Sequence, residues 1–186
     1  MAQNVKTFPI LETNRLLLRK VEKADANSIL KYLSDKEVMK YHGLAPFTSI
    51  NDALSEISWY HSIFNEKSGI RWGITLKGKN EVIGSCGFHS RTPEHYRTEI
   101  GYELHKSYWG QGIASEALEA VLKYGFDQLE LQRVEALIEP PNISSQKLVE
   151  KHGFIREGLL RKYEYTFGKF DDLYMYSLLK EDFKKL

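Results

Sequence analysis

Apolar residues recur with helical spacing near the N-terminus and give way to short strand-like runs in the middle of the chain. The runs 71–76, 81–88 and 97–104 are rich in β-branched and aromatic residues, and Gly- and Pro-containing turn signals separate them. This pattern predicts an antiparallel meander. Residues 112–129 return to helical spacing and 133–138 form another strand, so the order strand, helix, strand predicts a parallel crossover.

Two helices are expected before the meander, after a first strand over 15–19. The first begins near Lys23 and has an apolar stripe at i, i+3, i+4 and i+7: Ala26, Ile29, Leu30 and Leu33. The second follows Ser49, whose hydroxyl can cap it, and its buried stripe is Ala53, Ile57, Tyr60 and Phe64. The segment 35–47 between them is predicted to be an irregular loop.

The C-terminal part completes the sheet. Pro140-Pro141 end the strand before them, and Asn142 or Ser144 begins a short helix that Gly153 can end in the left-handed conformation. Runs at 154–157 and 172–179 supply the last strands. With 186 residues, 42% of them hydrophobic, we expect one domain over 1–186, a mixed α/β sheet with helices on both faces.

Composition narrows the function classes. Twenty-six basic and twenty-five acidic side chains give a net charge of +1, so we expect neither a nucleic acid nor a membrane surface as partner. The single cysteine, Cys86, cannot close an internal disulfide and is interpreted as a small core residue. We expect no metal site, because no Cys/His set has ligand spacing. From the lack of a continuous apolar stretch we expect neither a signal peptide nor a membrane span, and a soluble, cytoplasmic protein.

A glycine-rich turn, 109–114, lies between a strand and the long helix. Its small residues expose the free amides and the positive dipole end of the helix, where a pyrophosphate can bind to backbone donors. An isolated glycine pair more commonly only permits a tight turn. A Walker loop is absent. A nicotinamide-dependent oxidoreductase is a weaker alternative, because Ser115 replaces the third glycine of its fingerprint and Glu135 lies inside a strand.

Four motifs occur together in one order. They are Glu99-Ile100-Gly101-Tyr102, the run from Tyr108 to Ala117, Asn142 with Ser145, and Lys151-His152-Gly153-Phe154. In this combination the chain resembles the GNAT superfamily of N-acetyltransferases over 15–179, and within it the ribosomal-protein N-acetyltransferase (RimJ/RimL) type. Trp109 stands where the superfamily usually has Arg or Gln, and tryptophan is usual in the RimJ/RimL branch. The resemblance implies a GNAT fold, a mostly antiparallel sheet of six to seven strands that splays open after Leu104.

The resemblance also implies that acetyl-CoA lies in this gap as cosubstrate. Backbone amides around Glu103 and Leu104 would hold the pantetheine arm and the acetyl carbonyl. Asn142 would bind the pantetheine and Lys147 the 3′-phosphate, although turn chemistry and a solvated helix face are the ordinary roles of these two residues. The pyrophosphate would be held by Trp109, Gly110, Gln111, Gly112, Ile113, Ala114 and Ser115.

Acetyl transfer requires a neutral amine and a proton for the departing thiolate. At pH 7 an α-amine with a pKa near 7.7 costs about 1 kcal/mol to deprotonate, whereas a lysine costs about 4.6 kcal/mol. By the resemblance, Glu164 is the first candidate for the base and Glu99 the second, and Ser145 can protonate the sulfur. Each glutamate alone is more often a solvated strand residue, and Ser145 can also act in helix capping.

The expected acceptor is a primary amine, either a protein N-terminus or a small amine such as a polyamine or an amino sugar. The loop and second helix are expected to wall its pocket with Tyr41, His42, Trp59 and Tyr60, although the helical phase of Tyr60 favours the core. The alternative from another class is a non-catalytic acyl-CoA sensor or interaction domain. A homodimer is compatible with the resemblance.

Overall fold

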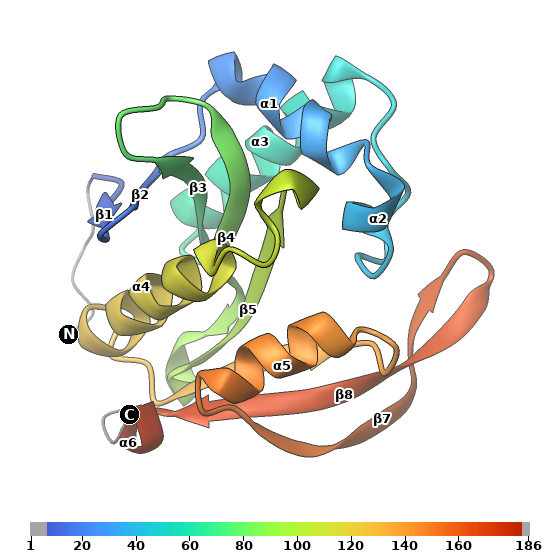
Figure 1. Ribbon diagram of the computed structural model, residues 1–186. Helices are drawn as coiled ribbons and strands as arrows, with labels where there is room; N and C mark the ends of the chain where they lie inside the picture. Colours follow the sequence, from blue (N-terminus) through green and yellow to red (C-terminus); the bar gives the residue numbers. More distant parts are fainter. Residues whose placement is uncertain (1–6, 184–186) are drawn as a thin grey trace.

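The computed structural model describes residues 7–183, and within this range eight strands form one open sheet (Figure 1). The strands are β1 (Leu11–Glu12), β2 (Leu16–Arg19), β3 (Ile70–Leu76), β4 (Val82–Thr92), β5 (Arg97–Leu104), β6 (Arg133–Ile138), β7 (Ile155–Thr166) and β8 (Lys169–Leu179). Their order is β1-β2-β3-β4-β5-β6-β8-β7, and every pair is antiparallel except β5 with β6. The predicted meander and parallel crossover are therefore confirmed.

The strand count exceeds the expected six to seven. The additional strand, β1, pairs with β2 only through Leu11 with Leu18 and Glu12 with Leu17. Two residues are too few to produce a recognisable alternation of polar and apolar side chains, so β1 has no signal in the sequence.

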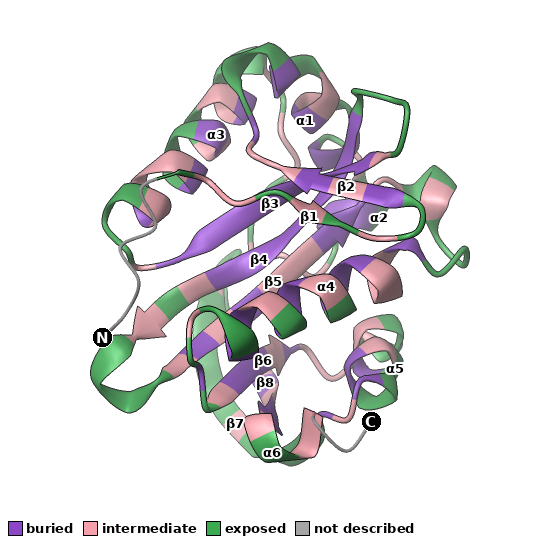
Figure 2. Ribbon diagram, turned by 90° about the vertical axis from the view of Figure 1, so that its left-hand side faces the viewer, coloured by how far each residue is buried: buried purple, intermediate pink, exposed green. Residues whose placement is uncertain are grey.

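Helices cover both faces of the sheet. α1 (Ala26–Leu33) and α3 (Ile50–Asn65) contribute to one buried cluster, whereas α4 (Ile113–Asp127) and α5 (Ile143–Lys151) contribute to another that includes Trp72 and Phe88. Figure 2 shows β3 and β4, largely buried, between α1 and α3 on one side and α4 on the other. Cys86 is buried in the second cluster, as predicted, and burial raises the pKa of its thiol to about 12. No helix in the described part of the chain is long and apolar enough to cross a membrane.

The predicted caps are present. Ser49 accepts from the Asp52 amide at 3.3 Å in a capping box, and Asn142 accepts from the Ser145 amide at 3.2 Å at the start of α5. Gly153 follows α5 with a φ of +82°. The remaining short elements are η1 (Lys23–Asp25), α2 (Lys36–Met39), η2 (Pro93–His95), η3 (Lys106–Tyr108) and α6 (Lys180–Phe183).

Two predictions of local structure were wrong. The segment 35–47 is not wholly irregular, because Asp35 accepts from the Glu37 amide and begins the four-residue α2. A single turn is too short for a helical period to be recognised. The last strands extend over 155–166 and 169–179, not only 154–157 and 172–179. Nearly all of β7 is exposed, so its sequence has no buried face to alternate, and the β7–β8 hairpin projects from the body in Figure 1.

The sheet opens between β5 and β6. These strands pair only at Arg97 with Arg133, Thr98 with Val134 and Glu99 with Glu135. The remainder of β5, residues 100–104, pairs with β4 alone. This divergence is the splay expected from the resemblance.

Candidate active site

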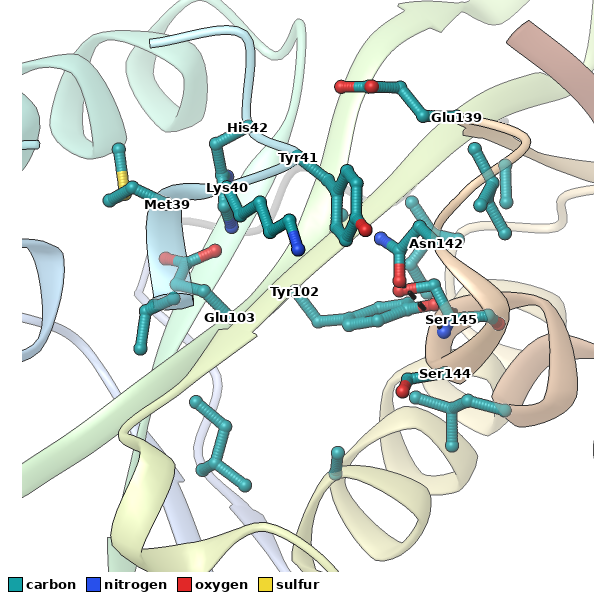
Figure 3. Close-up of a pocket in the computed structure, with 18 of the residues that line it drawn as sticks. Met39, Lys40, Tyr41, His42, Tyr102, Glu103, Glu139, Asn142, Ser144 and Ser145 are labelled. Atoms are coloured by element: carbon teal, nitrogen blue, oxygen red, sulfur yellow. Dashed lines mark hydrogen bonds between the residues drawn. The ribbon is translucent and has the colours of Figure 1, made fainter. Parts of the chain in front are cut away.

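A cavity of about 1230 Å³ occupies the opening between β5 and β6. Residues of β5, the N-terminal end of α4, α5, the α2–α3 segment and β7 line it. Successive β5 side chains point to opposite sides. Tyr102 projects towards Ser145 and Asn142, whereas the Glu103 carboxylate projects towards Met39 (Figure 3). The cavity therefore has two parts, one beside α4 and α5 and the other beside α2 and α3.

The turn before α4 has the backbone conformation that its glycines permit. Gly110 and Gly112 have φ angles of +72° and +75°, values that strain residues with a Cβ atom. Gly112 is the N-cap residue and offers no side chain to the first-turn amides. The first intrahelical bond runs from the Glu116 amide to the Gly112 carbonyl at 3.0 Å. The three preceding amides, at 113–115, are therefore left at the positive end of the helix dipole.

Nearly every residue expected to hold the cosubstrate lines this cavity. They are Glu103, Leu104, Trp109, Gly110, Gly112, Ile113, Ala114, Ser115, Asn142, Ser145 and Lys147. Gln111 does not line it. Its side chain donates to the Ser107 carbonyl at 2.8 Å and its own carbonyl accepts from Arg15 at 2.8 Å, so it supports the shape of the turn.

The main chain of β5 offers donors to the gap, among them the Leu104 amide. The His105 amide donates to the Ile83 carbonyl of β4 at 2.8 Å. Because alternate amides of a strand point the same way, the Glu103 amide also faces β4 and the Leu104 amide faces the gap. Consistent with this direction, the Leu104 carbonyl accepts from Nε1 of Trp109 at 2.8 Å.

The part of the cavity beside α4 and α5 is called the cofactor side here. Two contacts link its walls, and sequence reasoning missed both. The Tyr102 hydroxyl donates to the Ser145 carbonyl at 3.4 Å, which joins β5 to the first turn of α5. Lys151 Nζ donates to Ser115 Oγ at 3.1 Å, and Ser115 Oγ lies 2.8 Å from His152 Nε2. Lys151 lines the cavity and places a positive charge beside the open end of α4. Its sequence signal was present, because Lys151-His152 belongs to a motif that was recognised without a role.

The other part of the cavity has a buried polar floor. Arg71 forms an ion pair with Glu103 and donates through Nε to Ser85 Oγ at 2.7 Å. The Tyr60 hydroxyl donates to Glu103 Oε1 at 3.0 Å, and Ser85 also donates to this oxygen. Tyr60 is 2% exposed, so its predicted core position is confirmed, although its hydroxyl belongs to this floor. Burial by itself lowers the pKa of Arg71, but the Glu103 carboxylate outweighs this effect and leaves the pKa raised.

Three of the expected wall residues of the acceptor pocket line the cavity: Tyr41, His42 and Trp59. Tyr41 also donates through its hydroxyl to the Pro141 carbonyl at 3.3 Å, and Figure 3 shows it opposite Asn142. Burial lowers the pKa of His42, so its imidazole is neutral at neutral pH.

The two candidate bases differ in their surroundings. Glu99 is partly buried, and burial together with the nearby Glu135 carboxylate raises its pKa. His89 Nδ1 lies 3.9 Å from the Glu99 carboxylate, but burial and the Arg71 charge lower the pKa of His89 to about 4. The His89 ring is therefore neutral near pH 7, and the two do not form an ion pair. Glu164 is exposed on β7, and both glutamates line the cavity.

The chain has clear relatives. The family profile of the acetyltransferase (GNAT) domain matches residues 15–155. The uncharacterized N-acetyltransferase p20 of Bacillus licheniformis is 44% identical over 173 residues, which cover 93% of this chain and 97% of the relative. An acetyltransferase of the GNAT family from Bacillus anthracis, 33% identical, has a crystal structure that superposes with a TM-score of 0.83 and covers 93% of this chain and 99% of its own.

A more distant structure resembles the chain in fold. It is RimL, a ribosomal L7/L12 alpha-N-protein acetyltransferase in complex with coenzyme A. RimL superposes with a TM-score of 0.82 at 21% identity, and the match covers 92% of this chain and 98% of that one. At this identity the likeness concerns the fold alone.

Proposed function

The chain belongs to the GNAT family of acetyltransferases, and from this premise we propose that it transfers the acetyl group of acetyl-CoA to the primary amine of a protein N-terminus or a small molecule. The observation that carries the proposal is the opening between β5 and β6, with the uncapped amides of α4 at its edge. Trp109, in the position where this branch has tryptophan, supports an assignment to the RimJ/RimL type. A cytoplasmic location and a homodimer remain predictions.

In this proposal the cosubstrate lies along the cofactor side of the cavity. The amides of the first turn of α4 hold the pyrophosphate, together with the main chain of 109–112. The Leu104 amide, which faces the gap, binds the pantetheine arm or the acetyl carbonyl, and Asn142 binds the pantetheine. Lys147 and the newly identified Lys151 line the cavity and supply positive charge for phosphate groups.

Three side chains are proposed to handle protons. Glu99 or Glu164 removes a proton from the acceptor amine, and Ser145 returns one to the leaving thiolate. The partly buried position of Glu99 favours it, since a carboxylate with a raised pKa is a stronger base than a solvated one. An α-amine needs little help to lose its proton, so much of the acceleration comes from holding the two substrates together.

Thiol release and thermal shift, measured together, test the proposal. We expect free coenzyme A to be released from acetyl-CoA only when an accepted amine is present. We also expect acetyl-CoA, but not NAD, to raise the melting temperature, because a ligand specific for the native state stabilises it. Binding without turnover on a broad amine library would favour the acyl-CoA sensor instead. A shift with NAD alone would favour the oxidoreductase.

A pair of glycine variants locates the cosubstrate. Gly110→Ala and Gly78→Ala each place a Cβ in open space at a positive φ, of +72° and +77°. Both should therefore lose about 1 to 2 kcal/mol of stability from backbone strain. Only Gly110 lines the cavity, so only Gly110→Ala should raise the KM for acetyl-CoA, by about tenfold. Equal KM values in the two variants would exclude the pyrophosphate from this turn.

A further inference from the structure

The part of the cavity beside α2 and α3 is called the acceptor side here. Its floor holds the Arg71 guanidinium, a charged group that no step of acetyl transfer requires. Arg71, Ser85, Gly101 and Glu103 lie on one face of the sheet, because the register pairs Ser85 with Glu103 and places Gly87 between Arg71 and Gly101. The Arg71 side chain is only 6% exposed, and it nevertheless lines the cavity. A core position on this face would normally be apolar.

The guanidinium of Arg71 is only partly satisfied. Nε donates to Ser85, and Nη2 pairs with Glu103. Within residues 7–183, Nη1 donates to no protein atom, although it is not among the fully buried atoms without a partner. A buried charged donor without an acceptor is costly, so a free Nη1 at a cavity wall is a position where a ligand atom gains much by binding.

A glycine keeps the space at Nη1 open. A Cβ atom at Gly101 would lie 2.7 Å from Arg71 Nη1 and 3.3 Å from His89 Nε2. Any larger residue at 101 would therefore displace the guanidinium or the imidazole. Gly101 lies on β5 three residues before Leu104 and lines the same cavity. Nη1 is therefore next to the strand that leads to the acetyl-binding amide of the proposed function.

We propose that Arg71 Nη1 binds an oxygen atom of the acceptor next to its reacting amine, so that the enzyme selects amines with an adjacent carbonyl or carboxylate group. This inference rests on the proposed function. Glu103 neutralises the guanidinium, so an approaching ammonium group meets little net repulsion, while the unpaired N–H still requires an acceptor. Carbonyl and carboxylate oxygens offer the lone pairs that Nη1 needs. Polyamines offer only further ammonium groups, which cannot accept a hydrogen bond from Nη1.

A matched set of acceptors tests the selection in the unmodified protein. Alaninamide has the carbonyl oxygen, alanine has the carboxylate, and isopropylamine has neither on the same carbon skeleton, while spermidine represents polyamines. Because these amines differ in pKa, kcat/KM is compared per neutral amine. On this basis we expect the value for alaninamide or alanine to exceed that for isopropylamine by about tenfold or more, the effect of one hydrogen bond to a charged donor. The better of the two identifies the oxygen. Equal or faster turnover of isopropylamine or spermidine would overturn the inference.

Variants assign the selection to Arg71. Arg71→Lys keeps a cation beside Glu103 but lacks the third nitrogen. Gly101→Ala keeps both charged residues but places a Cβ 2.7 Å from Nη1, so that the guanidinium must shift. Both should raise the KM for alaninamide or alanine about tenfold. In both, the ratio of kcat/KM for alaninamide or alanine to that for isopropylamine should fall towards one, while the thermal shift with acetyl-CoA shows that the cosubstrate still binds.

The control is Ser85→Ala, which removes the hydrogen bonds of Ser85 to Arg71 Nε and to Glu103 but leaves Nη1 and both charged residues. It should lower stability without changing the preference among amines. If Arg71→Lys and Gly101→Ala slow all amines equally, Arg71 has only a structural role and the inference is wrong. If no amine is acetylated although acetyl-CoA binds, the proposed function itself fails, and the inference fails with it.

Discussion

Two glutamates of the cavity differ in burial, and kinetics can show which of them acts as the base. Glu99 lies partly buried near Glu135, and burial together with the Glu135 carboxylate raises the Glu99 pKa. Glu164 is exposed on β7. A base with a raised pKa is protonated over a wider acidic range, so an enzyme that depends on Glu99 loses activity as pH falls through that raised value.

We predict that Glu99→Gln removes the acidic limb of the kcat/KM profile and lowers kcat by about 10- to 100-fold, a loss at or below the lower end of what a general base usually contributes. Glu164→Gln should keep the limb and most of the rate. Steady-state kinetics between pH 5 and 9 on both variants provide the measurement. A profile that loses its limb only in Glu164→Gln would transfer the role of base to Glu164.

Individual site residues could be identified from the sequence where the same short motif also determines the backbone conformation at that residue. Gly110, Gly112 and Asn142 have positive φ angles or capping bonds that depend on neighbours within a few positions. The roles of Arg71 and His89 could not be anticipated. Each depends on partners 14 or more positions away, or on burial that the register of the sheet creates.

One side-chain cluster joins three strands at the end of the sheet that is closed by β6, β7 and β8. Arg133 of β6 donates to Glu157 of β7, with an Nη1 to Oε1 distance of 2.8 Å, and Ser177 of β8 donates to the same Oε1 at 2.7 Å. The Arg133 guanidinium and the Ser177 hydroxyl hold the pKa of Glu157 down to about 2. The cluster fixes the base of the long, exposed β7–β8 hairpin.

The lowered pKa of Glu157 gives a pH-dependent contribution to stability. A carboxyl with a depressed folded-state pKa stabilises the protein above its unfolded value, near 4.5, and this contribution is lost as pH falls towards 2. We predict that Glu157→Gln costs about 1 kcal/mol at pH 7, since the pair is partly exposed and screened, and that the difference disappears near pH 2. Urea unfolding at both pH values measures it.

A surface pair offers the matched control for this element. Lys123 and Asp127 of α4 form an i, i+4 ion pair with largely exposed side chains. Asp127→Asn should therefore change stability by less than half as much at pH 7. A cost for Asp127→Asn as large as that for Glu157→Gln would mean that general surface charge, and not the three-strand cluster, stabilises the sheet.

At the scale of the whole molecule, the sheet has two halves, β1 to β5 and β6 to β8, which meet at the β5–β6 junction. The β5–β6 junction has only three paired positions, and side-chain contacts such as Tyr102 with Ser145 cross the remaining gap. A cosubstrate bound along the gap would contact both halves. At a hundredfold excess over its Kd it would add about 2.7 kcal/mol to the free energy of unfolding.

We predict a specific pattern of hydrogen exchange from this arrangement. Acetyl-CoA should slow exchange at the Leu104 amide, at 113–115 and in the first turn of α5, because these donors face the gap or lie at its edge. Exchange in α1 and α3 should change little. Mass spectrometry with and without acetyl-CoA measures the pattern, and protection confined to α1 and α3 would contradict the proposed site.

The sequence by itself determined the helices with clear periods, the meander, the crossover and the turn before α4. Each depends on interactions between residues close in the chain, such as i to i+4 packing, a cap or a glycine φ. Only the tertiary structure decided the length of β7, the single turn of α2 and the polar floor around Arg71. These depend on exposure, on short pairings and on strand register, which bring together side chains that no local pattern connects.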